Sequence, residues 1–296
     1  MQLALYDPTA GYYRGNRQRI GFVKDSDFFT ASSSNPVFGE LIAAACVRLL
    51  GPRRAKDYTF VEIGAESKSS VLDQVAHPFA SARTIGIGES LQIAGNCVVF
   101  SNELFDAQPF RRFVVREGSW MELGVQLHDD RLVEVELTTP APPELPRGLP
   151  DGYRIDAPFA ANELIQQIAA QNWSGLFVAC DYGKSWRELI EACPAGTARA
   201  YFSHQQSNDL LARPGEQDLT CHICWDWLAT SLKDHRFARP SVESQESFFI
   251  RHAAESIAAI STAEAAGFSR RKASLLQLLH PAHLGQKFQV LHALRD

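Results

Sequence analysis

The sequence lacks the long apolar segments and the basic runs that mark membrane and nucleic-acid proteins. No apolar run approaches the length of about 18 residues that a membrane-spanning helix needs, and the start shows no signal-peptide pattern. The longest basic run is Arg270-Arg-Lys272, and the net charge is −5 with a pI near 6.0. This balance gives no sequence-wide attraction for nucleic acid or anionic lipid. We therefore expect a cytoplasmic protein, without membrane insertion, whose partner is a protein or a small molecule.

Cysteine is sparse as well, and its spacing provides no zinc framework. The 6 cysteines are scattered in apolar stretches, which is typical of small core residues in a reducing compartment. Only Cys221-His-Ile-Cys224 has the spacing of a metal or redox pair. A structural zinc needs two further ligands, and no second Cys-x-x-Cys exists, although His204, His235 and His252 are available. We therefore predict no metal site, and a metal or redox function is the least favoured reading.

At 296 residues with 45% hydrophobic content, the chain can bury a full core as one large α/β domain or as a domain with an inserted lobe. Hydrophobic periodicity predicts helices near 1–7, 35–50, 158–172 and 270–279, and strands near 58–63, 83–88, 96–101, 173–181 and 287–293. Residues 110–137 alternate apolar and polar side chains around turns at Glu117-Gly118 and Asp129-Asp130, which predicts an antiparallel meander. The proline-rich connection 139–150 that follows has too few backbone donors for a helix or a central strand.

One predicted strand, 96–101, stops abruptly at a group of polar and acidic side chains. In open α/β sheets ligands bind beyond the carboxyl ends of the strands, so these side chains are site candidates. They are Ser101, Asn102, Glu103 and Asp106. Glu103 and Asp106 are three residues apart, which places both carboxylates on one side of a turn or helix. In the alternative reading, Asn102 or Ser101 only caps the next helix.

A second predicted strand, 58–63, leads into a turn that is typical of nucleotide-binding βα units. It ends near Glu62 and Gly64. Several serines come next, followed by the apolar residues of an expected helix with Asp73 in its first turn. In such units the helix N-terminus and a close backbone approach receive the ligand. The turn holds a single glycine, so the fingerprint is weak by itself. A later strand ends in Asp181-Tyr182-Gly183, which is either a further site candidate or an ordinary loop entry.

Segments along the whole chain match, in order, the motifs of one known family. They are 3–13, 27–42, 60–64, 181–183, 196–201, 214–222 and Asn102-Glu-Leu-Phe-Asp-Ala-Gln-Pro109. Together they resemble the MidA family of S-adenosylmethionine-dependent methyltransferases. The mitochondrial members of that family are assembly factors for respiratory complex I and methylate an arginine of a partner subunit.

The resemblance implies an α/β fold, a Rossmann-like class I methyltransferase sheet with an N-terminal helical segment, an inserted antiparallel meander and an inserted helical lobe. The implied division is 1–56 for the helical segment, 57–202 with 263–296 for the α/β domain, and 203–262 for a lid or partner-binding lobe. It also implies S-adenosylmethionine as the cofactor and an arginine of a protein substrate as the methyl acceptor. Whether the protein forms a homodimer is left open.

Residue roles follow from the matched motifs. The resemblance implies that Asn102, Glu103 and Asp106 are catalytic. Glu103 and Asp106 would localise charge on a guanidinium, whose fork of donors suits carboxylate oxygens, and Asn102 would orient the nitrogen through its carbonyl oxygen. The implied cofactor contacts are Thr30, Glu62, Gly64, Glu89 and Ser101.

The segment 203–262 is polar, and we expect a tryptophan-bearing helix around 224–231 within it. In the family this region is a lobe that closes over the site. Glu243, Gln245 and Glu246 stand beside an aromatic strip and are further candidates to face a guanidinium.

Two departures from the family pattern bear on the cofactor. The family's turn is Gly-Pro-Gly-x-Gly, whereas this chain has Gly64-Ala-Glu-Ser-Lys68, whose glutamate and lysine would crowd the pocket. Only 38 residues separate Gly64 from Asn102, so one strand and its helix are expected to be missing or reduced. Glu89, 25 residues after Gly64, is either the acid that binds the ribose hydroxyls or a surface turn residue. The chain begins inside the first motif, so a truncated start is expected.

Two functions of different classes therefore remain. The first is an active protein methyltransferase with the cofactor bound over Gly64, and the intact motif 102–106 favours it. The second is a catalytically degenerate relative that serves as a non-enzymatic assembly or scaffolding factor. The glycine-poor turn favours this second function.

Overall fold

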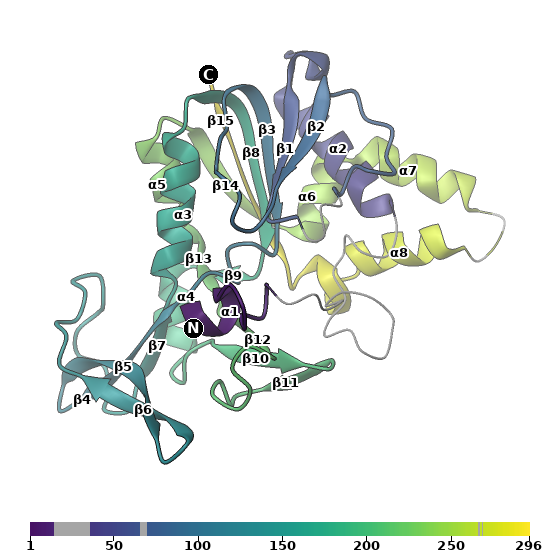
Figure 1. Cartoon of the computed structure of the whole chain (residues 1–296). Coiled ribbons are helices and arrows are strands. Elements are labelled where there is room, and N and C mark those ends of the chain that lie inside the picture. Colours follow the sequence, from purple (N-terminus) through teal and green to yellow (C-terminus); the bar gives the residue numbers. More distant parts are fainter. Residues whose placement is uncertain (15–35, 66–69, 266, 268) are drawn as a thin grey trace.

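The computed structural model describes residues 1–14, 36–65, 70–265, 267 and 269–296, and its centre is a six-stranded, mostly parallel sheet (Figure 1). The strand order is β14-β15-β8-β3-β1-β2. The strands are β1 (Thr59–Ile63), β2 (Ser81–Ile85), β3 (Gly95–Asn102), β8 (Trp173–Asp181), β14 (Ala238–Ser244) and β15 (Gln289–Arg295). β2, β1, β3 and β8 pair in parallel, and β15 is antiparallel to both β8 and β14. This architecture confirms the predicted fold class.

Helices cover both faces of this sheet (Figure 1). One face carries α2 (Val37–Leu50), α6 (Gln245–His252), α7 (Ala254–Ala263) and α8 (Arg270–Leu279), and the other carries α3 (Phe159–Ala170) and α5 (Trp225–Asp234). Successive strand residues point to opposite faces, so Val98 and Phe100 of β3 join the α2 side of the core while Val99 joins the α3 side. A sheet buried on both faces explains the almost continuous apolar run of β3.

The predicted meander is confirmed. It forms a separate four-stranded antiparallel sheet in the order β6-β5-β4-β7. Its strands are β4 (Arg111–Arg116), β5 (Ser119–His128), β6 (Arg131–Leu137) and β7 (Arg154–Ala157). The turn residues Glu117, Gly118, Asp129 and Asp130 all have positive φ, as tight turns require.

Smaller elements lie beneath the carboxyl ends of the central strands (Figure 1). They are α1 (Gln2–Tyr6), β9 (Gly183–Lys184), α4 (Trp186–Ala192), β10 (Arg199–Phe202), β11 (Gln205–Ser207), β12 (Asp218–Thr220) and β13 (Ile223–Cys224). Helical turns cover Ala55–Asp57 and Pro281–Gly285. Leu5 of α1 packs with Tyr12 against Ala200 and Leu219, so the first residues of the chain are anchored on the small sheet β11-β10-β12.

The helix expected after Gly64 is absent from the described residues 70–80, which form turns and bends. Hydrogen bonds to Glu62 hold this segment in a turn. One carboxylate oxygen of Glu62 accepts hydrogen bonds from the Ser70 hydroxyl and the Val71 amide, both at 2.8 Å. About ten residues then remain before β2, too few for a helix and its connections. β2 is the only strand between β1 and β3 in the described ranges, as expected.

The predicted lobe 203–262 contributes to several layers. Its N-terminal part forms β11 and β12, whereas α5 packs on the sheet and β14 is a strand of the sheet itself. The division into domains stays a prediction. Within the described ranges, none of the helices combines the length and the apolar character needed to cross a bilayer.

Candidate active site

A cavity of about 1420 Å³ lies at the carboxyl ends of β1, β2, β3 and β8. Its lining includes the segments that follow these strands, Glu62–Ala65, Ile85–Glu89, Asn102–Leu104, Asp106–Gln108 and Tyr182–Lys184. The opposite wall comes from α1, β10 and β12, with Tyr6, Arg199, Tyr201 and Asp218 among the lining residues. This is the position that ligands take in open α/β sheets.

Glu62 and Gly64 both face this cavity from the end of β1. Glu62 is buried, and its hydrogen bonds to Ser70 and Val71 fasten the end of the turn to the strand. Burial raises the pKa of Glu62 even though these hydrogen bonds lower it. Gly64 has φ +81°, a left-handed conformation that favours glycine, and a Cβ there would lie 2.7 Å from Leu104 Cδ1 and push that side chain aside.

The other expected cofactor residues take different places. Glu89 lies in the turn after β2, lines the cavity and accepts the Gly86 amide at 2.8 Å. Ser101 is buried within β3 and does not line the cavity, and its hydroxyl makes no hydrogen bond with any described residue. Thr30 lies outside the described residues, as do Glu66 and Lys68 of the turn. The binding roles of all these residues stay predictions.

Asn102 and Glu103 enter the cavity where β3 ends. Glu103 has φ +51°, an unfavourable conformation for a residue with a side chain, and its amide donates to the Cys180 carbonyl at 2.9 Å. The Asn102 amide nitrogen donates to Glu103 Oε1 at 3.0 Å. Residues 103–110 form turns, so the alternative that Asn102 or Ser101 caps a helix here is wrong. Strained backbone of this kind is concentrated at functional sites.

Asp106 pairs with a partner that the sequence did not reveal, Asp181 at the end of β8. Asp181 is fully buried, and its oxygens accept the amides of Phe105 and Tyr182, each at 2.8 Å. Burial raises the pKa of Asp181 to about 7 and that of Asp106 well above its ordinary value, and the two side chains are hydrogen-bonded. The pair therefore shares a proton, with the Asp106 carboxyl donating to the Asp181 carboxylate.

Tyrosines form the opposite wall, and sequence reasoning missed them as site residues. The rings of Tyr6 and Tyr13 are stacked with centroids 5.4 Å apart. The Tyr6 hydroxyl donates to the Ala107 carbonyl at 2.9 Å, and the Tyr13 hydroxyl donates to Asp218 Oδ1 at 2.8 Å. Both tyrosines belong to the first family motif, 3–13, so the motif match was the signal in the sequence that could have identified them as site residues.

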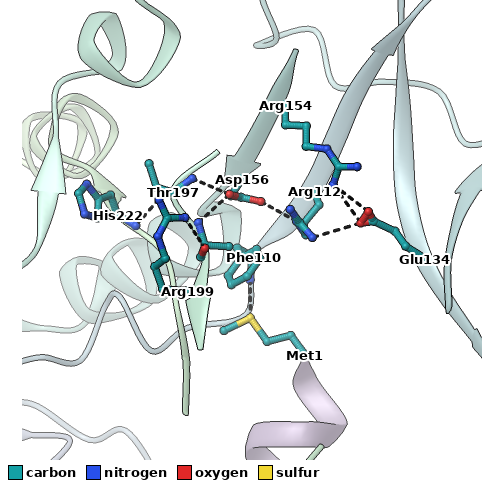
Figure 2. Close-up of polar contacts among 10 residues, drawn as sticks. Met1, Phe110, Arg112, Glu134, Arg154, Asp156, Thr197, Arg199 and His222 are labelled. Atoms are coloured by element: carbon teal, nitrogen blue, oxygen red, sulfur yellow. Dashed lines mark hydrogen bonds and ion pairs between the residues drawn. The ribbon is translucent and has the colours of Figure 1, made fainter. Parts of the chain in front are cut away.

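Asp156, a buried carboxylate that does not line the cavity, holds the backbone of Thr197, which does (Figure 2). Asp156 of β7 accepts the amides of Thr197 and Ala198, both at 2.7 Å, and the Arg112 Nε at 2.8 Å. The Thr197 hydroxyl in turn accepts the amide of His222 at 3.1 Å. Thr197 and His222 line the cavity, and burial lowers the pKa of His222 to about 4, so that imidazole is neutral.

Other sequence candidates lie elsewhere. The expectation that Glu243, Gln245 and Glu246 face the site is wrong, because none of them lines the cavity. Gln245 is fully buried, and its side chain donates to the Leu278 carbonyl at 3.0 Å. Of the two cysteines, Cys221 does line the cavity and Cys224 does not. Both are buried free thiols, and burial raises the pKa of Cys224 to about 12.

Comparison with known proteins identifies the family of the chain. A family model described as "Putative S-adenosyl-L-methionine-dependent methyltransferase" matches residues 49–241. This match confirms the family inferred from the sequence motifs. A search of curated proteins returned no significant match.

Two solved structures from Burkholderia thailandensis have the same fold. One, determined with S-adenosyl-homocysteine bound, aligns with a TM-score of 0.83 at 21% identity and covers 99% of this chain and 86% of that chain. The other is the native structure of an uncharacterized protein of the same superfamily, with a TM-score of 0.82, 20% identity and coverage of 99% and 85%.

Proposed function

The chain belongs to this methyltransferase family, and on that premise we propose that it transfers the methyl group of S-adenosylmethionine to a guanidinium nitrogen of an arginine in a protein substrate. The cofactor would supply an electrophilic methyl group on a sulfonium, whose displacement needs no metal.

The cavity fits this cofactor. Its position at the strand ends is where nucleotide ligands bind, and its volume of about 1420 Å³ exceeds what one small molecule needs. Gly64 leaves the strand end free of a Cβ, and Glu89 offers a carboxylate beyond β2, where a ribose acid is expected. The structure of the relative with S-adenosyl-homocysteine bound supports the same cofactor class.

The observation that carries the acceptor class is a group of acidic and aromatic side chains in the wall of the cavity. Glu103, Asp106 and Asp218 all line the cavity, together with Tyr6 and Tyr13. Carboxylate oxygens accept the planar fork of a guanidinium, and tyrosine faces attract cations. An arginine side chain therefore suits this wall better than an anionic or apolar acceptor.

The chain's own groups can manage the proton of the reaction. The acceptor nitrogen forms a bond to the methyl carbon, the bond from that carbon to sulfur breaks, and the nitrogen loses one proton. Glu103 is the candidate base, because it stands at the strand end in the cavity with Asn102 hydrogen-bonded to its carboxylate. Asp106 already shares a proton with Asp181, so its role is to hold the acceptor rather than to take that proton.

The test is methyl incorporation from labelled S-adenosylmethionine into arginine-containing peptides and their lysine counterparts. We expect transfer to arginine only. Glu103→Gln should abolish transfer while leaving cofactor affinity and melting temperature nearly unchanged, because it removes the charge and keeps the shape. Asn102→Ala should reduce transfer by misplacing Glu103. Retained transfer by Glu103→Gln would reject the assigned role of this residue.

One observation favours the second function, a catalytically degenerate assembly or scaffolding factor. The described residues 70–80 form turns in place of a helix whose N-terminus could receive an anionic group. Calorimetric titration with S-adenosyl-homocysteine decides between the two. If the protein is a methyltransferase, we expect measurable binding. Absence of heat and of a thermal shift at millimolar ligand would reject the methyltransferase function and support the scaffolding role.

A further inference from the structure

A second cluster of ligand-forming side chains lies on the face of the sheet that α6 covers and does not line the cavity. It consists of Glu243 on β14, His292 on β15 and His252 at the end of α6. One oxygen or nitrogen atom from each residue lies within 4.8 Å of the others. Local sequence patterns do not predict this cluster, because His292 is 49 residues away from Glu243 along the chain.

The strand register and a short helix bring the three side chains together. Ser241 pairs with His292 across the antiparallel β14 and β15, so Glu243, two residues on, is a diagonal neighbour of His292 on the same face. The chain then turns directly into α6, where the Ser244 hydroxyl accepts the Ser247 amide at 3.2 Å as an N-cap. This helix ends at His252, which therefore lies over the two strands.

The distances are those of a nearly formed coordination site. The His252 Nε2 and His292 Nε2 atoms lie 2.9 and 3.0 Å from the same oxygen, Glu243 Oε1. Around a tetrahedral zinc with bonds of about 2.0–2.2 Å, neighbouring ligand atoms lie about 3.3 Å apart. Shifts of a few tenths of an ångström would admit the ion.

The surroundings of the cluster also favour a cation. The three side chains are largely buried, with exposed fractions of 8% for Glu243, 18% for His252 and 13% for His292. The second oxygen of Glu243, Oε2, is buried and makes no hydrogen bond among the described residues, although the guanidinium of Arg251 lies 3.1 Å away. In this structure the Arg251 guanidinium is the positive partner of Oε2, and because that side chain is 69% exposed, a bound ion can replace it at low cost.

We propose that Glu243, His252 and His292 bind a divalent transition metal ion, with zinc as the best fit, and leave one position for water. Two imidazoles and one carboxylate are a donor set that suits zinc. The ion would fasten α6 to the strand pair β14 and β15. This site is independent of the methyl-transfer site.

Titration of the chelator-treated full-length protein with zinc chloride tests the proposal by calorimetry. We expect one equivalent to bind, and His252→Ala or Glu243→Gln to weaken binding at least about tenfold. Arg251→Gln should strengthen binding severalfold, because it removes a neighbouring positive charge. The matched control is the double variant His280→Ala, His283→Ala, which removes an exposed histidine pair with ring centroids 5.0 Å apart and should leave binding unchanged.

A cobalt spectrum of the unmodified protein keeps the test decisive should a variant fail to fold. Four- or five-coordinate Co²⁺ with nitrogen and oxygen ligands gives visible absorption bands without the near-ultraviolet charge-transfer band of a thiolate. A thiolate band would locate the metal at cysteine and overturn the proposal. Absence of zinc binding, or equal binding by His252→Ala and the unmodified protein, would overturn it too.

Discussion

Glu103 occupies a left-handed backbone conformation, with φ +51°, at the end of a buried strand. This conformation costs a residue with a side chain roughly 1 kcal/mol or more, and glycine adopts it without that cost. We predict that Glu103→Gly raises the free energy of unfolding by about 0.5–1 kcal/mol and abolishes methyl transfer. Urea unfolding and labelled-methyl incorporation measure the two effects.

Glu117 is the matched control for this prediction. It has φ +50° in the exposed turn between β4 and β5, away from the cavity. Glu117→Gly should give a similar gain in stability and leave transfer unchanged. A loss of stability in Glu103→Gly alone would mean that the side chain itself holds the loop.

The Asp106 and Asp181 pair predicts that stability depends on pH. Its folded pKa values are raised above those of the unfolded chain, with Asp181 near 7, so the pair contributes stability at low pH that is lost as pH rises from about 4 through 7. Asp106→Asn keeps a donor toward Asp181 but removes one acid, so its unfolding free energy should change less between pH 5 and 8. Equal pH dependence in both proteins would contradict the shared proton.

The position of the acidic motif was predictable from the sequence, whereas its partners were not. An apolar run that ends at Asn102 and Glu103 indicates a buried strand and a site at its carboxyl end. The contact between Asp106 and Asp181 spans 75 residues and that between Tyr13 and Asp218 spans 205, so neither leaves a local pattern. Such contacts follow from strand order and from the docking of distant segments, which periodicity does not encode.

At the scale of elements, Asp156 joins the meander to Thr197 and Ala198, the residues directly before β10 (Figure 2). Asp156→Ala would leave the Thr197 and Ala198 amides without their acceptor, and Arg112 would keep only its contact with Glu134. We predict a loss of roughly 2–4 kcal/mol in unfolding free energy. Chemical denaturation checks this value.

The exposed pair of Arg116 and Glu136 on the same sheet provides the control. Its two side chains are 44% and 42% exposed, so Glu136→Ala should cost less than about 1 kcal/mol. Equal losses in Asp156→Ala and Glu136→Ala would show that burial of Asp156 does not matter.

Elements with regular patterns were predicted well, and those set by tertiary context were not. The strands β4, β5 and β6 alternate polar and apolar residues around two turns, which fixes them locally. In contrast, residues 238–244 look polar, yet they form β14 because an edge position beside β15 needs little apolar surface. The serines and apolar residues after Gly64 suggested a helix, but in the described residues 70–80 the bonds to Glu62 hold turns instead.

At the scale of the whole molecule, the sheet joins the regions that the sequence divided. β14 lies inside the predicted lobe 203–262, but it is hydrogen-bonded to β15 of the α/β domain, and α5 packs on the same sheet. The cavity also draws lining residues from both regions, Glu103 from one and Asp218 from the other. Unfolding of the lobe should therefore be coupled to unfolding of the sheet and of the cofactor site.

This coupling leads to a calorimetric prediction. S-adenosyl-homocysteine at about 100 times its dissociation constant should stabilise the folded chain by about 2.7 kcal/mol and raise the melting temperature by roughly 5–8 °C. One transition should move as a unit, and Glu103→Gln should show the same shift, because it retains the cofactor site. Two transitions, of which the ligand moves only one, would mean that residues 203–262 unfold independently, and the sheet pairing of β14 with β15 would then not be what joins the two regions.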